Sequence, residues 1–254
     1  MTNNLLIAHS NPKSPTAEAF RTLRTNIQFS NIDKKIKTIV VTSSGPGEGK
    51  STVISNLAVT MAQVYNKVII IDADLRKPRV HRIFSVFNSD GLTTVLADRI
   101  DYKEAVKSAG IKGLDVLTSG PIPPNPAELL GSKRMKNFIE ELSEEYDMIL
   151  IDAPPIGIVT DAAVLSTICD GVILVCAVGQ AVINAAVNAK NLLEKVNANI
   201  LGVIMNKIPI DEGVYYKHHF YSYYQSYYED EDIDIKRNSR VNSKRKAGAR
   251  SRSK

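Results

Sequence analysis

The sequence predicts an α/β fold, with a mostly parallel sheet covered by helices on both faces. Strand-length apolar runs alternate with helical patterns from residue 37 onward, and a glycine-rich loop links the first run to a helix. With 254 residues, 44% of them apolar, the chain can bury one large core. Its apolar runs are far shorter than the roughly 20 residues of a membrane span, so we expect a soluble protein.

Each element follows from a local pattern. Runs rich in Ile, Val and Leu predict strands at 37–43, 67–72, 114–118, 147–152, 171–178 and 199–206. Helical spacing of apolar residues predicts helices at 51–64, 91–98, 101–109, 132–145, 159–168 and 181–197. A further helix, "TAEAFRTLRTNIQF", follows Pro15 and precedes the sheet. The pattern ends at Asn206, so we expect the folded domain to span 1–207.

Two segments of different composition follow. Residues 208–235 hold seven of the ten tyrosines and then a run of acids, whereas 236–254 hold nine Lys and Arg residues and no acid. The net charge of +5 therefore belongs to the tail, because the remaining 23 bases face 27 acids, a balance of −4. The basic tail has too few apolar residues to form a core, and we predict that it is disordered.

Neither cysteine nor histidine chemistry is indicated. Cys169 and Cys176 lie in or beside an apolar run, where buried small hydrophobes are expected, and the four histidines have no metal-ligand spacing. The N-terminus lacks the pattern of an export signal, so we expect a cytoplasmic protein.

The loop "SSGPGEGKST" predicts a phosphate-binding site. Its three glycines allow a tight turn in which successive N–H groups face phosphate oxygens, next to a helix N-terminus. Lys50 would reach the β- and γ-phosphates from a solvent-facing loop, and the Ser51 hydroxyl would coordinate Mg²⁺. Ser44 stands where the P-loop pattern G-x-x-x-x-G-K-[ST] has glycine, a mild departure.

Three aspartates end predicted strands. "IIIDADLR" supplies Asp72 and Asp74, and "MILIDAPP" supplies Asp152. Each alone could be a helix cap or a turn former. Because parallel strands end at one edge of the sheet, we expect all three carboxylates to converge on the phosphates.

These motifs and the tyrosine cluster resemble those of the bacterial tyrosine kinases (BY-kinases), in particular the free-standing cytoplasmic kinases of capsule and exopolysaccharide systems. The resemblance covers roughly residues 10–228. It identifies "IIIDADLRKP" as the Walker A′ motif, with Asp72, Asp74 and Arg76, and "MILIDAPP" as Walker B, with Asp152. The Walker A loop supplies the cofactor-binding residues for ATP, namely Gly45, Gly47, Glu48, Gly49, Lys50, Ser51 and Thr52.

The resemblance also implies roles for individual side chains. The catalytic set comprises Lys50, the three aspartates and Arg76, with Asp72 as candidate base and with Ser51, Asp74 and Asp152 on Mg²⁺. Asn206 could contact adenine by analogy with related nucleotide-binding folds, or simply end a strand. Glu18, Arg21 and Arg24 match an E-x-x-R-x-x-R motif that mediates ring assembly in the family; a solvated charged face is the alternative.

The tyrosine cluster is then explained as the phosphoacceptor of a neighbouring subunit. We predict autophosphorylation in trans at Tyr215, Tyr216, Tyr221, Tyr223, Tyr224, Tyr227 and Tyr228, which would loosen the ring by charge repulsion. An adhesive aromatic patch for a protein or carbohydrate is the alternative. The family implies further partners, which are protein-tyrosine substrates and a membrane-protein activator that would hold the kinase at the inner face of the cell membrane.

Two other functions are weighed against the kinase. A MinD/ParA-like positioning ATPase shares the architecture, but it carries a signature lysine where this chain has Gly45, and it gives the tyrosines no role. A non-catalytic scaffold would need a damaged site, and every expected catalytic residue is present. The basic tail lies outside the family pattern; weak contact with anionic lipid or nucleic acid and simple solubility are its candidate roles.

Overall fold

The computed structural model describes residues 5–30 and 36–209 of the chain. Its compact unit ends at Ile208. The seven tail tyrosines, the acidic run and the basic tail lie outside the described residues. The divisions at 207 and 235 therefore stay predictions.

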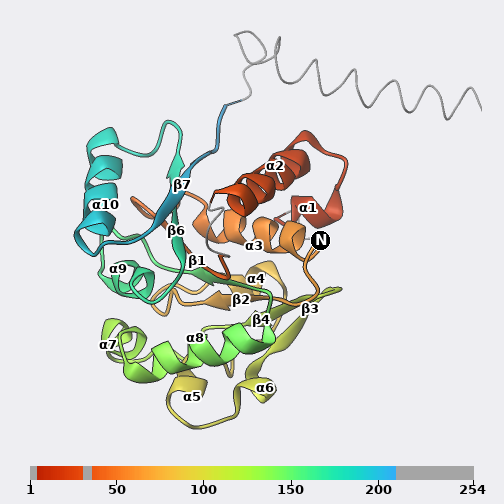
Figure 1. The fold of residues 1–254 in the computed structure, drawn as a ribbon, viewed down its shortest axis with the longest axis vertical. Coiled ribbons are helices and arrows are strands. Elements are labelled where there is room, and N and C mark those ends of the chain that lie inside the picture. Colours follow the sequence, from red (N-terminus) through yellow and green to blue (C-terminus); the bar gives the residue numbers. More distant parts are fainter. Residues whose placement is uncertain (1–4, 31–35, 210–254) are drawn as a thin grey trace, which may run out of the picture. The chain divides into compact units, whose positions relative to one another are not determined.

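A seven-stranded sheet forms the centre of this unit, in the order β3-β4-β2-β5-β1-β6-β7 (Figure 1). All neighbouring strands pair in parallel except β3 and β4, which are antiparallel. The predicted fold class is confirmed. The strands are β1 (Thr38–Ser43), β2 (Val68–Asp72), β3 (Lys107–Ile111), β4 (Leu114–Leu117), β5 (Met148–Asp152), β6 (Gly171–Ala177) and β7 (Ile200–Asn206).

The central strands are buried on both sides, which explains their continuous apolar sequences. Every residue of β1, β2, β5 and β6 is buried. Successive side chains of a strand point to opposite faces, so Ile69 and Ile71 join one hydrophobic core while Val68 and Ile70 join the other. Two cores, one on each face, hold the helices against the sheet.

The helices form two layers, one against each face of the sheet. One layer contains α1 (Ile7–Ser10), α2 (Pro15–Phe29), α3 (Lys50–Met61) and α4 (Val80–Ile83). The other contains α5 (Leu92–Leu96), α6 (Tyr102–Ala105), α7 (Pro126–Leu130), α8 (Lys133–Glu145), α9 (Asp161–Ser166) and α10 (Ile183–Lys195). Among residues 5–30 and 36–209, no helix is long and apolar enough to cross a membrane.

One predicted helix is wrong over half its length. The predicted helix 101–109 ends at Ala105, and Lys107–Ile111 forms the edge strand β3. Val106 adopts an extended backbone (φ −68°, ψ 136°) that ends the helix, and within the described sheet β3 then pairs only with β4. The helices α1, α4 and α7 were not predicted, because four or five residues are too few to show a helical period.

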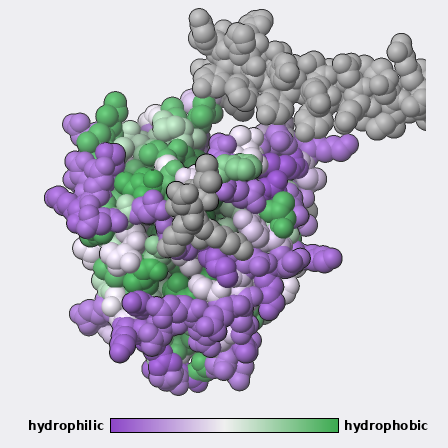
Figure 2. Space-filling view, in the orientation of Figure 1, coloured by the Kyte–Doolittle hydropathy of each residue, from purple (hydrophilic) through white to green (hydrophobic). Residues whose placement is uncertain are grey.

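The opposite edge of the sheet exposes apolar side chains. Val203 and Met205 of β7 are more than half exposed, and so are Ile183 and Val187 of the adjacent α10. Figure 2 shows apolar side chains gathered over the upper end of α10 and beside β7. Exposed apolar groups on an edge strand are typical of a surface that meets another protein.

Candidate active site

The phosphate loop lies between β1 and the first turn of α3. Gly47 and Gly49 have φ values of 75° and 91°, in the left-handed region that glycine alone adopts readily. Gly49 precedes Lys50, where α3 begins, so Lys50, Ser51 and Thr52 form its first turn. A Cβ atom at Gly49 would lie 2.3 Å from Nδ2 of Asn206. Glycine is therefore required here for both conformation and space.

The lysine of the loop lies between two acids from different strands. Lys50 Nζ is 2.8 Å from Asp74 Oδ2, after β2, and 3.2 Å from Asp152 Oδ1, at the end of β5. The Ser51 hydroxyl lies 3.4 Å from the same ammonium. Lys50 is only 8% exposed, so the side chain is buried rather than solvent-facing as the sequence suggested.

One carboxylate oxygen of Asp152 is buried without a hydrogen-bond partner among the described residues. This oxygen is Oδ2, and the whole side chain is fully buried. Burial raises the pKa of this carboxyl, and the Lys50 ammonium opposes that shift. Mg²⁺ prefers oxygen ligands. The unbonded oxygen of Asp152, the Ser51 hydroxyl and the Asp74 carboxylate supply such oxygens close together. Ser51, Asp74 and Asp152 could therefore hold the metal.

Asp72 is bonded mainly to the loop that follows its strand. Its Oδ2 accepts hydrogen bonds from the N–H groups of Arg79 (3.0 Å) and Val80 (2.9 Å), and Oδ1 accepts one from Asp74 (3.3 Å). The side chain is fully buried. Burial and the neighbouring Asp152 raise the pKa of Asp72 to about 8, against the effect of the hydrogen bond from Val80 and of the Lys50 ammonium.

The serine that departs from the P-loop pattern has a structural partner. Oε1 of Glu48 accepts a hydrogen bond from the Ser44 hydroxyl at 2.6 Å, and Oε2 accepts one from the Ser44 N–H at 3.2 Å. Glu48 is 3% exposed, and Gly45 lies inside the turn that this contact closes. The hydroxyl at position 44 thus satisfies a buried carboxylate, which a glycine would do less well.

Three side chains hold the outer side of the loop by its carbonyl oxygens. Gln180 Nε2 donates to Pro46 O (2.9 Å), Lys207 Nζ donates to Gly47 O (2.7 Å), and Asn206 Nδ2 donates to Glu48 O (2.8 Å). Lys207 also donates to Gln180 Oε1 (2.9 Å). We call Gln180, Asn206 and Lys207 the loop clamp. Sequence reasoning missed Gln180 and Lys207, although both follow strand ends at the edge where the aspartates lie.

Arg76 holds a buried acid that the sequence analysis did not single out. Its Nε and Nη2 donate to the two carboxylate oxygens of Asp161 at 3.0 and 3.1 Å, and Asp161 is fully buried at the start of α9. The side chain of Arg76 is 40% exposed. This two-point ion pair ties the loop after β2 to the segment after β5, and so supports both halves of the site.

The three residues of the N-terminal motif make contacts within the chain. Arg21 pairs with Glu18 and also donates to the Pro12 carbonyl. Arg24 donates to the carbonyl of Thr60 (2.8 Å), at the C-terminal end of α3. All three are partly exposed. They therefore stabilise α2 and its contact with α3, and a test of their role in assembly needs a check of folding.

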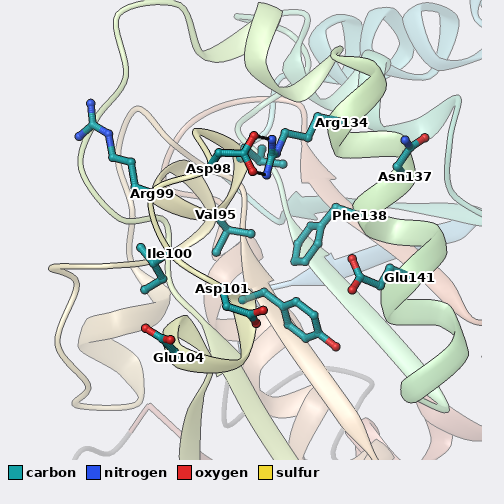
Figure 3. A pocket seen from close by; sticks show the side chains of 12 residues that line it. Val95, Asp98, Arg99, Ile100, Asp101, Glu104, Arg134, Asn137, Phe138 and Glu141 are labelled. Atoms are coloured by element: carbon teal, nitrogen blue, oxygen red, sulfur yellow. Dashed lines mark hydrogen bonds and ion pairs between the residues drawn. The ribbon is translucent and has the colours of Figure 1, made fainter.

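A pocket of about 750 Å³ lies away from these residues, between α5, α6 and α8 (Figure 3). Asp98 and Arg134 form an ion pair across its rim, and Phe138 lies in its wall. The ring of Tyr102 packs edge-on against Phe138, with ring centres 5.7 Å apart. The Tyr102 hydroxyl donates to Glu145, and burial together with this bond raises its pKa. None of the predicted catalytic residues lines this pocket.

Comparison with known proteins connects this site to one family. A ParA-type family model described as NUBPL iron-transfer P-loop NTPase matches residues 34–210. Tyrosine-protein kinase YwqD of Bacillus subtilis (strain 168) is 48% identical over 219 residues, which are 86% of this chain and 90% of YwqD.

Solved structures give the same relationship. The chimerical protein CapA2B2 superposes with a TM-score of 0.79 and 42% identity, over 81% of this chain and 91% of that one. The kinase domain of Escherichia coli tyrosine kinase ETK gives 0.78 and 35%, over 83% of each chain. The MinD cell division protein of Aquifex aeolicus shares the fold at only 0.56 and 26%, over 68% of this chain and 70% of that one, which leaves the positioning ATPase as the weaker alternative. On the glycine loop, the strand-end aspartates and these similarities, the chain is a P-loop protein that belongs to the bacterial tyrosine kinase (BY-kinase) family.

Proposed function

We propose that this tyrosine kinase phosphorylates the tyrosine cluster of neighbouring copies in trans and thereby regulates capsular or exopolysaccharide synthesis. The observation that carries the proposal is the position of Lys50 between Asp74 and Asp152. One cation and two acids from separate strands meet at the first turn of α3, where phosphate oxygens bind in P-loop proteins. This arrangement suits phosphoryl transfer, which depends on positioning and on neutralising charge.

In the proposed reaction a tyrosine oxygen attacks the γ-phosphorus of ATP and the bond to the β,γ-bridging oxygen breaks, so that ADP leaves. The phenol proton passes to a carboxylate, for which Asp72 remains our candidate. Burial and the neighbouring Asp152 raise the pKa of Asp72, so its ionised form is a stronger base than an ordinary carboxylate. Three of its roughly four acceptor positions are used by backbone N–H groups.

The remaining predicted residues have supporting roles. Mg²⁺, when bound, would supply positive charge to the phosphates, and Ser51, Asp74 and Asp152 would hold it. Lys50 would bind phosphate oxygens, and the N–H groups from Gly45 to Thr52 would orient them. We retain Asn206 as an adenine contact through its amide oxygen, since its amide nitrogen already binds Glu48 O.

The tyrosines of the described domain are poor acceptors, which supports the tail as the substrate. Tyr102 and Tyr146 are buried, and their hydroxyls donate to Glu145 and Asp115. The Tyr65 hydroxyl accepts a hydrogen bond from Gln28 and is half-buried. Phosphate transfer to Tyr102 or Tyr146 would require these bonds to break and the rings to leave the protein interior.

Phosphosite mapping after incubation with MgATP tests the proposal. We expect the phosphate on the seven tail tyrosines, and none after their replacement by Phe, while an added tyrosine substrate is still modified. The Lys50→Met variant is expected to be inactive toward both. Major phosphotyrosines at Tyr65, Tyr102 or Tyr146 would overturn the assignment of the tail as acceptor.

Assembly and location belong to the same proposal. We propose a ring of copies that uses Glu18, Arg21 and Arg24, together with a membrane-protein activator at the inner face of the cell membrane. The apolar residues exposed on β7 and α10 support association with another protein. Light scattering of Arg21→Ala/Arg24→Ala, after circular dichroism has shown a native fold, tests the ring; an unchanged oligomer would refute it.

The basic tail is proposed to add weak binding to anionic lipid. Nine cations without an amphipathic pattern can bind only through charge, so this affinity should fall steeply with salt. Vesicle sedimentation of the full chain and of a chain ending at Ile235 measures it. Equal binding at physiological salt would exclude this role.

A further inference from the structure

A pair of exposed cations follows Asp72, the last residue of β2, and Asp74, which lies two residues beyond it. In the sequence "DADLRKPRV", Lys77 lies three positions after Asp74, and Arg79 lies seven positions after Asp72. Both side chains are exposed, and neither forms an ion pair with an acid of the described residues. Arg76, by contrast, is already paired with Asp161. We call Lys77 and Arg79 the basic rim.

The backbone of this rim is fixed to the active site. Lys77 N donates to Asp74 Oδ1 at 3.0 Å, and Arg79 N donates to Asp72 Oδ2 at 3.0 Å. The catalytic carboxylates thus bind the N–H groups of the two residues and leave the charged ends of their side chains for other partners. None of the ion pairs among the described residues joins these carboxylates to the side chain of Lys77 or Arg79.

A tyrosine that reaches these aspartates brings its neighbours in sequence close to the rim. An extended chain advances about 3.3 Å per residue, so the four residues after an accepted tyrosine span roughly 13 Å. In this chain the four residues after Tyr228 are all acids, Glu229 to Asp232. The charges of the rim and of this run are opposite.

We propose that Lys77 and Arg79 form a subsite for acidic residues that directly follow the accepted tyrosine, and that Glu229–Asp232 of a second copy is its occupant. The inference rests on the proposed function, because it assumes that tail tyrosines enter the site. It adds a sequence preference to that function. Tyr227 and Tyr228 are then the first tyrosines of the cluster to be phosphorylated, ahead of Tyr215 and Tyr216.

A matched pair of peptides tests the subsite. Both span residues 221–235 and keep Tyr228 as the only tyrosine; one retains the acids, and the other carries Glu229→Gln, Asp230→Asn, Glu231→Gln and Asp232→Asn. The enzyme is the full chain with its seven tail tyrosines changed to Phe and the same four acids changed to amides, so that its own tail does not compete. The readout is the ratio of kcat/KM for the two peptides, which a general loss of activity does not change.

We expect the acidic peptide to be preferred about tenfold, mainly through a lower KM, with a preference that shrinks as salt rises. Lys77→Ala/Arg79→Ala should bring the ratio close to one. Lys77→Glu/Arg79→Glu should reverse the preference, so that a peptide with lysines at positions 229–232 is phosphorylated better than the acidic peptide. The matched control is Lys136→Ala/Lys190→Ala, which removes two exposed cations from α8 and α10 and should leave the tenfold ratio unchanged.

The outcomes separate the subsite from the function on which it rests. Equal use of both peptides, or a preference that survives loss of the rim, overturns the subsite and leaves the kinase intact. If neither peptide is phosphorylated, the tail is not the acceptor and both proposals fail. If the rim variant loses binding to anionic vesicles while its peptide preference is unchanged, the rim serves a lipid surface and the peptide subsite is refuted.

Discussion

Replacement of Lys50 by Met should reduce stability as well as activity. The ammonium lies between Asp74 and Asp152 at 2.8 and 3.2 Å, and all three side chains are at least nine-tenths buried. Methionine keeps the length of the side chain and removes its charge. The carboxylates of Asp74 and Asp152 would then face each other, and also Asp72, without a cation.

The size of the effect follows from this geometry. Removal of one partner of a buried ion pair typically costs about 3–5 kcal/mol, because a buried charge loses its compensation. We therefore expect the free energy of unfolding of Lys50→Met to fall by about that amount at pH 8. The exposed Lys190 gives a matched control: it pairs with Glu194 one helical turn away at 2.7 Å, and Lys190→Met should cost about 0.3–0.5 kcal/mol.

The loss should depend on pH in a defined direction. The pKa of Asp72 is raised to about 8 and that of Asp152 is also raised, whereas unfolded aspartates titrate near 3.9. Between these values the folded state binds more protons, so stability decreases as pH rises toward 8. Without the ammonium both pKa values rise further. The loss in free energy of unfolding of Lys50→Met relative to wild type should therefore be smaller at pH 5.5 than at pH 8.

Urea unfolding of wild type, Lys50→Met and Lys190→Met at pH 8 and pH 5.5 measures all of these quantities. Inactivity of Lys50→Met in a phosphorylation assay is expected in addition, but it does not test the ion pair. A loss in free energy of unfolding of Lys50→Met below about 1 kcal/mol at both pH values would refute a stabilising role of the buried ion pair. A loss that grows as pH falls would refute it as well.

Three further predictions concern the surroundings of the site. Arg76→Ala leaves the Asp161 carboxylate buried and unpaired, so urea unfolding should show a free energy of unfolding lower by about 1–3 kcal/mol. Arg76→Lys should restore only part of this stability, because lysine cannot form the two-point bond. Gly49→Ala forces a Cβ atom to within 2.3 Å of Asn206 at φ 91°, and titration with a fluorescent ATP analogue should show binding weakened at least about tenfold; unchanged binding would contradict the assigned turn. Lys207→Met removes a hydrogen bond to the Gly47 carbonyl and should raise the Kd of the same analogue about 3- to 10-fold with little change in urea midpoint, whereas Lys207→Arg should bind nearly as wild type.

The elements that could be predicted from the sequence are those with a strong local pattern. β1, β2, β5 and β6 are buried on both faces, so their continuous apolar runs are visible without knowledge of their neighbours. β3 could not be found in this way. The segment "KSAGI" has no clear alternation of apolar residues, and its extended form depends on pairing with β4.

The same distinction applies to the site. Strand order along the chain is enough to bring Asp74 and Asp152 to one edge, and a fixed spacing marks the phosphate loop. The contacts of Asp161 with Arg76, and of Gln180 with Pro46, join residues 85 and 134 positions apart. No local pattern records such pairs. The burial of Lys50 was missed for a related reason, since it results from acids 24 and 102 positions further along the chain.

The C-terminal end of β7 holds the nucleotide loop and also lies shortly before the tyrosine cluster in the sequence. Asn206 and Lys207 hold carbonyls of the nucleotide loop, and Tyr215, the first tyrosine of the cluster, follows Lys207 after only eight positions. If capture of that segment by a neighbouring subunit displaces either side chain from the loop, it changes the affinity for nucleotide. Thermodynamic reciprocity then requires that nucleotide changes the strength of capture by the same factor. Binding of the nucleotide and binding of the tyrosine segment by a neighbouring subunit would then be linked equilibria within one chain, with no need for a separate sensor.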